Sequence, residues 1–147
     1  MNETFIPVSD HKKKNWCLID CKDQKLGRIA SEISCLLAGK QKQDYHPSFD
    51  VGDYVIVINA QDMLFDSDRP RFSVNVPGRP GRSLKQVLNA LPSQLLMRAV
   101  YGMLANGAAK KSLAKRLKIY NGDNHVHQAQ NPIEIDVTDL YSSLKIG

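Results

Sequence analysis

The run Tyr54-Val55-Ile56-Val57-Ile58 decides the fold class of this chain. Every position is apolar, which is typical of a parallel strand covered on both faces and not of a strand with one face in water. Upstream, Trp16-Cys17-Leu18-Ile19 predicts a second short buried strand. Between the two, apolar residues recur at three- and four-residue steps from Leu26 to Leu37, which predicts a helix that ends near Gly39. Strand, helix and strand in this order predict a right-handed βαβ unit, and hence an α/β fold.

Downstream of this unit the periodicity is lost from Met63 to Arg82, where prolines, glycines and arginines gather. This composition predicts an extended basic loop or arm, with a short strand at 71–76. Residues 84–91 predict a helical turn or two, and Pro92 suits the first position of a helix that reaches about Leu104.

The last third of the chain predicts one more helix and two strands. Residues 108–117 have the pattern of a helix, and Lys118-Ile119-Tyr120 that of a strand that enters a turn at Asn121-Gly122. Residues 133–137 alternate like a late strand. We expect one domain over residues 16–137, with tails at 1–15 and 138–147.

Composition excludes several classes of protein. The chain has 147 residues, enough to bury a core without metals or disulfides. Its three cysteines, Cys17, Cys21 and Cys35, are an odd number without paired spacing, which favours a reducing compartment. The longest apolar run, 54–58, is too short to cross a membrane. Residues 1–10 do not resemble a secretory or Arg-rich transit peptide.

Charge is distributed unevenly along the chain. The net charge is +5, yet residues 69–122 hold 11 Lys and Arg and 0 Asp and Glu, while the segments on either side are each net acidic. An acid-free segment of this length indicates either a surface for a polyanion or a solvated basic face, and charge alone leaves both open.

The sequence shows no recognisable catalytic or nucleotide-binding site. The turn 20–25 after the first strand lacks GxGxxG and GxxxxGK[ST], and Gly27 alone cannot cradle a pyrophosphate. His46 with Asp50 and Asp53 is not accompanied by a nucleophile, so capping and turn roles are expected for these three. A small α/β enzyme that uses the strand ends near Asp20 and Asn59 remains an alternative.

His125-Val126-His127 is the candidate metal motif. Cys17 and Cys21 are remote further ligands, but neither CxxC nor helical HxxxH spacing is present. Hydrogen bonding within an ordered loop, or to RNA, is the alternative, and we expect no metal and no cofactor.

Two basic elements make RNA binding the favoured hypothesis. Arginine side chains match phosphate oxygens bidentately, and glycine and proline let a thin backbone approach closely, as the loop 69–82 would require. A second cluster lies on the predicted helix, where residues one turn apart line one face: Lys110, Lys111, Lys115, Arg116 and, just beyond it, Lys118. Such a surface suits A-form RNA, which is recognised by shape and backbone.

These residues, taken in order, resemble the universal large-ribosomal-subunit protein thirteen family in its bacterial and plastid form. The matching motifs are Leu26-Gly27-Arg28-Ile29-Ala30, Gly39-Lys40, Asp50-x-Gly52-Asp53 with the run 54–60, Gly78-Arg79-Pro80-Gly81, Gly102-Met103-Leu104, Leu117-Lys118-Ile119-Tyr120-x-Gly122 and His125-x-His127-x-Ala129-Gln130-x-Pro132. The resemblance implies a three-layer α/β/α fold with a mostly parallel four-stranded sheet, binding to large-subunit rRNA, early subunit assembly, and no catalytic activity.

The chain also departs from the family pattern. Ser73 to Val76 stand where an aromatic, two basic residues and a histidine are usual, Arg82 replaces a glycine, Ala105 a proline and Ala114 a phenylalanine. The loop should therefore contribute less affinity than Lys110 to Lys118, with Arg69, Arg71 and Arg82 as partial replacements. The opening Met1-Asn2-x-Thr4-Phe5-x-Pro7 is similar to cyanobacterial and plastid members, which favours a chloroplast ribosome over the bacterial cytoplasm.

The expected partners are 23S-type rRNA and neighbouring large-subunit proteins, without a membrane or a small-molecule substrate. An extra-ribosomal RNA-binding regulator is the main alternative. The residues expected to contact RNA are Arg28, Lys40, Lys42, Arg69, Arg71, Gly78, Arg79, Pro80, Gly81, Arg82, Lys110, Lys111, Lys115, Arg116, Lys118, His125 and His127.

Overall fold

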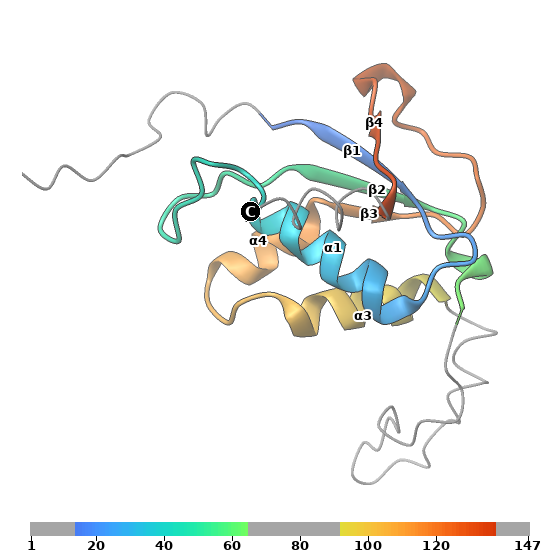
Figure 1. Ribbon diagram of the computed structural model, residues 1–147, viewed down its shortest axis with the longest axis horizontal. Coiled ribbons are helices and arrows are strands. Elements are labelled where there is room, and N and C mark those ends of the chain that lie inside the picture. Colours follow the sequence, from blue (N-terminus) through green and yellow to red (C-terminus); the bar gives the residue numbers. More distant parts are fainter. Residues whose placement is uncertain (1–13, 65–91, 138–147) are drawn as a thin grey trace, which may run out of the picture.

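A computed structural model of the chain describes residues 14–64 and 92–137 (Figure 1). In chain order its elements are β1 (Trp16–Asp20), α1 (Leu26–Ala38), β2 (Tyr54–Ile58), the 3-10 helix η1 (Ala60–Asp62), α3 (Pro92–Met103), α4 (Ala109–Lys115), β3 (Leu117–Ile119), the 3-10 helix η3 (Gln128–Gln130) and β4 (Ile133–Glu134). None of the helices within these two segments is long and apolar enough to cross a bilayer.

The four strands form one sheet in the order β3-β2-β1-β4, and all three pairings are parallel. β1 and β2 pair along their full lengths, from Trp16 opposite Tyr54 to Asp20 opposite Ile58. Val55, Ile56 and Val57 are fully buried, as the continuous apolar run predicts for a central strand. The predicted α/β class is confirmed, and the strand–helix–strand unit is β1–α1–β2.

One face of the sheet carries the hydrophobic core. Cys17, Ile19, Val55, Val57 and Leu117 point to this face, because in-register residues of parallel strands share a side. Helix α1 contributes the predicted apolar stripe, and α3 adds a second set of buried side chains. In Figure 1 α1, α3 and α4 lie on this side of the sheet.

The opposite face carries aromatic side chains. The indole of Trp16 stacks on the Tyr54 ring at 4.4 Å, and the His127 ring lies 5.2 Å from Trp16. His127 also meets Tyr120, which follows β3, so the loop that contains η3 reaches across β2 on this face. The arrangement is consistent with the predicted three-layer α/β fold.

Helix α1 ends where the sequence indicates, and its end makes a tight junction with the chain that enters β2. Gly39 adopts the left-handed conformation with φ 79°, and its N–H donates to Cys35 and Leu36 carbonyls. Gly52 passes so close to this end that a Cβ there would lie 1.7 Å from the carbonyl oxygen of Leu37. Only glycine fits at this approach.

The remaining element predictions differ in outcome. Helices α3 and α4 are confirmed. The late strand expected over 133–137 is limited to Ile133–Glu134, since only these two residues pair with Cys17 and Leu18 before Val137 turns into the core. The predicted loop strand 71–76 and the helical turns 84–91 lie outside the described residues, as do parts of both tails, so the domain boundaries stay a prediction.

Candidate nucleic-acid interface

Helix α4 presents part of the predicted basic cluster to solvent. Lys111 and Lys115 are exposed and one helical turn apart, and Lys115 lies in the last turn, where a cation is favoured by the helix dipole. Lys110 is half-buried: its ammonium donates to Asn106 Oδ1 at 3.1 Å and lies 4.3 Å above the ring of Tyr101. Leu113, on the inner side, packs against the core and orients the helix.

Lys118 extends the basic surface beyond the helix. It lies on the edge strand β3, and its side chain is exposed on the sheet face opposite α4. Within the described segments Lys111, Lys115 and Lys118 have no carboxylate partner. These three uncompensated charges flank one edge of the molecule.

Arg116 is a correction to the predicted set. Its residue is 6% exposed, and its guanidinium donates to Gly52 O at 2.9 Å, to Leu37 O at 3.2 Å and to Asp50 Oδ1 at 2.7 Å. The guanidinium thus links the end of α1 to the segment that enters β2. Its side chain therefore has a structural role in the fold, because its terminal nitrogens donate to groups of the protein; the Nε is buried as well and has no partner among the described groups.

A network of charges surrounds this junction. Lys14 reaches Asp50 at 3.3 Å and donates to the carbonyls of Asp50 and Gly52. Burial, followed by the neighbouring positive charge of Arg116, lowers the pKa of Lys14. Lys14 and Arg116 therefore both form ion pairs with the half-exposed carboxylate of Asp50.

Lys42 is the second correction. Its ammonium lies 2.7 Å from both the Asp53 carboxylate and the Val51 carbonyl, and Asp53, 3% exposed, also accepts from the backbone N–H of Asn15. The positive charge of Lys42 compensates a buried carboxylate, and this ion pair holds the loop 40–53 in place. Asp50 and Asp53 thus form ion pairs with Lys14, Arg116 and Lys42, whereas the sequence predicted capping and turn roles for them.

Arg28 and Lys40 are both exposed but belong to different regions. They lie at opposite ends of α1, a separation of about 18 Å along a helix of this length. Lys40 follows Gly39 directly and borders the connection between α3 and α4. The structure therefore brings Lys40, and not Arg28, towards the α4 cluster.

The two predicted histidines are held within the loop they belong to. His125 Nδ1 accepts from the His127 backbone N–H at 3.3 Å, and His127 Nε2 and the Tyr120 hydroxyl are 3.0 Å apart. Hydrogen bonding in an ordered loop, one of the two predicted roles, is confirmed. The aromatic cluster of Trp16, Tyr54 and Tyr120 around His127 was missed, since no sequence spacing connects these positions.

Cys17 and Cys21 do not form a metal site with His125 and His127. Both are buried, and burial raises the pKa of Cys17 to about 11 and that of Cys21 to about 12. Protonated thiols are poor metal ligands and nucleophiles at neutral pH. Among the residues described, no group of three potential ligands lies together.

The polar side chains at the ends of β1 and β2, which an enzyme would use, are hydrogen-bonded to each other. Asp20 Oδ1 accepts from Asn59 Nδ2 and from the backbone N–H of Lys22, each at 2.9 Å. Asn59 adopts the left-handed conformation and tethers the end of β2 to the end of β1. His46 likewise serves a turn, its Nδ1 accepting from the Ser48 N–H at 3.1 Å, as predicted.

Seven of the predicted contact residues lie outside the described part of the chain: Arg69, Arg71, Gly78, Arg79, Pro80, Gly81 and Arg82. Their contribution stays a prediction.

Comparison with known proteins identifies the family. The sequence pattern of the family described as ribosomal protein L13 matches residues 14–126, which includes the first described segment completely and the second up to residue 126. The chain belongs to the ribosomal protein L13 family. This family is structural and not enzymatic, in agreement with the resemblance carried by the motifs.

Three relatives indicate which branch of the L13 family the chain resembles. The large ribosomal subunit protein uL13c of Trieres chinensis is 80% identical over 136 residues, 92% of this chain and 98% of the relative. The uL13 of Microchaete diplosiphon is 36% identical over 146 residues (95% and 97%), and that of Synechococcus elongatus 38% over 138 residues (90% and 91%). The predicted likeness to plastid and cyanobacterial members is confirmed.

Proposed function

We propose that the chain is a structural constituent of the large ribosomal subunit, which binds 23S-type rRNA and supports early assembly of the subunit. Membership of the L13 family supports the subunit assignment. The 80% identity to the plastid protein uL13c supports a plastid ribosome as its location, with a bacterial-type ribosome as the alternative.

The single observation that carries RNA binding is the uncompensated basic edge made by Lys111, Lys115 and Lys118. A buried or paired cation is not free to bind a phosphate. These three side chains are exposed and lack a carboxylate partner in the described segments. Phosphates bound here would release condensed counterions, which is the main driving force of backbone recognition. The rigid attachment of α4 to the core through Leu113 keeps the charges in place.

The test is the salt dependence of binding to a 23S-type rRNA transcript. Lys111→Ala and Lys115→Ala should each lower the magnitude of the slope of log K against log salt by about 0.7 to 0.9, the contribution of one phosphate. Lys22→Ala is the matched control, because Lys22 is exposed in a turn outside the acid-free segment and should leave the slope unchanged. Equal slopes in all four proteins would contradict the proposed surface.

The loop can be compared with the helix in the same assay. Arg79→Ala should reduce affinity less than Lys111→Ala, because the loop lacks several basic residues usual for the family. Sedimentation of salt-washed large subunits then separates an integral constituent, which remains bound, from a regulator that acts away from the ribosome and is washed off.

A further inference from the structure

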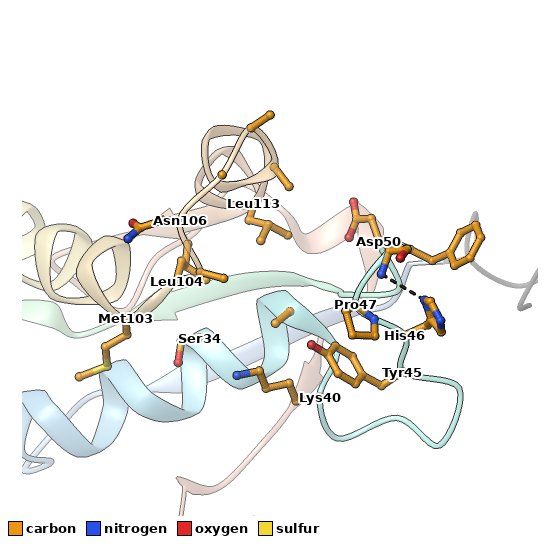
Figure 2. Close-up of a pocket in the computed structure, with 17 residues that line it drawn as sticks. Ser34, Lys40, Tyr45, His46, Pro47, Asp50, Met103, Leu104, Asn106 and Leu113 are labelled. Atoms are coloured by element: carbon orange, nitrogen blue, oxygen red, sulfur yellow. Dashed lines mark hydrogen bonds between the residues drawn. The ribbon is translucent and has the colours of Figure 1, made fainter.

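A groove lies next to the basic edge, between the loop that follows α1 and the α3–α4 connection (Figure 2). Its volume is about 380 Å³. One wall carries Lys40, Tyr45, His46 and Phe49, and the other carries Leu113 and residues 103–109. This volume is at the small end of the roughly 300–1,000 Å³ typical of ligand sites, which suits one flat heterocycle and not a helix.

Large apolar side chains of the groove are exposed to solvent. Tyr45 is 39% exposed and Met103 47%, and they belong to opposite walls. His46 packs against Phe49 at 5.4 Å with its Nδ1 occupied by Ser48, so its Nε2 carries the proton and is available as a donor. Rings beside a donor are the groups by which proteins hold an unstacked base.

The charges around the groove favour an anionic occupant. The ammonium of Lys40 has no hydrogen-bond or ion-pair partner within the described residues, while the carboxylate of Asp50 is compensated by Lys14 and Arg116. The wall formed by residues 103–109 and Leu113 belongs to the acid-free segment, and Lys110 and Lys111 follow residue 109 directly in α4. An RNA strand that follows α4 therefore passes the mouth of the groove.

The groove is also pre-formed. Lys42 donates to Val51 O and Asp53 Oδ1 within the loop 40–53, and Arg116 joins Gly52 and Asp50 of this loop to Leu37 O of α1, so little ordering is needed when a ligand enters. We propose that this groove receives an unpaired base of the large-subunit rRNA, stacked on Tyr45 with its phosphate near Lys40. The inference rests on the proposed rRNA binding and adds to it a nucleotide-specific contact.

The test compares Tyr45→Ser with Tyr45→Phe, which keeps the ring, in binding and chemical probing of the 23S-type transcript. Removing the ring should weaken binding about tenfold, as loss of one base stack does. The salt slope should stay unchanged, since no phosphate contact is lost. At least one unpaired nucleotide protected by the wild type and by Tyr45→Phe should become reactive with Tyr45→Ser.

Met103→Ala, on the opposite wall, provides a second variant should Tyr45→Ser lower the unfolding midpoint, and it should expose the same nucleotide. Wild-type affinity and an unchanged protection pattern in both variants would overturn the proposal while leaving rRNA binding intact. Loss of a crosslink to a neighbouring protein with RNA protection unchanged would also overturn it, in favour of a peptide occupant. Failure of the wild-type protein to bind the transcript would instead reject the proposed function.

Discussion

Arg116 and Lys111 lie in the same basic stretch but differ in burial and in contacts. Arg116 is buried against two backbone carbonyls and Asp50, whereas Lys111 is exposed on α4. Charge is therefore a poor guide to RNA contact at the scale of one residue, because an arginine can satisfy carbonyl groups inside the fold as well as phosphates outside it.

This difference predicts that two methionine variants affect different properties, one the stability and the other the RNA binding. Arg116→Met should lower the free energy of unfolding by about 2 kcal/mol, because the Leu37 carbonyl loses its side-chain donor, while Gly52 and Asp50 keep only Lys14. Lys111→Met should change stability by less than about 0.5 kcal/mol and weaken RNA binding instead. Urea unfolding measures the stability of both variants, and RNA titration measures their affinity. An Arg116→Met protein of wild-type stability with weakened RNA binding would contradict the structural role.

At the scale of elements, the junction between α1 and β2 depends on two glycines. Gly39 ends the helix in the left-handed region, and Gly52 lets the entering chain touch the last carbonyls of α1. Asp53 N–H then donates to Leu36 O, so the helix end is satisfied by the same segment that starts the central strand. The groove proposed for RNA is built on this junction.

Gly52→Ala should therefore be among the most destabilising small changes in the chain. The added methyl group would lie 1.7 Å from a backbone oxygen and force the junction apart, at a cost of about 3 kcal/mol or more. Gly102→Ala is the control: it lies in α3 with nothing within 4 Å of the new Cβ, and it should raise stability by roughly 0.5 to 1 kcal/mol. Thermal unfolding of the two variants checks the opposite signs.

At the scale of the whole molecule, stability should decline from the centre of the sheet to its β4 edge. β2 is paired on both sides, with three buried residues, whereas β4 pairs through two exposed residues, Ile133 and Glu134. Edge strands with few buried contacts open locally without unfolding the protein.

Hydrogen exchange tests this gradient. The amides of Val55 and Val57 should exchange only through global unfolding. The Ile135 N–H, which donates to Leu18 O at 2.9 Å, should exchange at least about tenfold faster through local opening. Equal protection at Ile135 and Val57 would mean that β4 belongs to the cooperative core.

The α/β class, the positions of β1, α1, β2 and α3, and the family were all determined by the sequence, because each depends on local information. Apolar runs, helical periodicity, a proline at a helix start and ordered short motifs are all read along the chain. The exposed lysines of α4 also followed from helical spacing.

Only the tertiary structure decided which basic residues remain available. Arg116 is paired with Asp50 and Gly52, which are near it only after α4 and the loop 40–53 meet at the end of α1, and Lys42 is paired with Asp53 only once that loop folds back on itself. The groove beside Tyr45 and the cluster around His127 arise in the same way. Long-range contacts bring together groups whose separation along the chain carries no periodic signal, so side-chain burial and pairing could not be predicted from spacing.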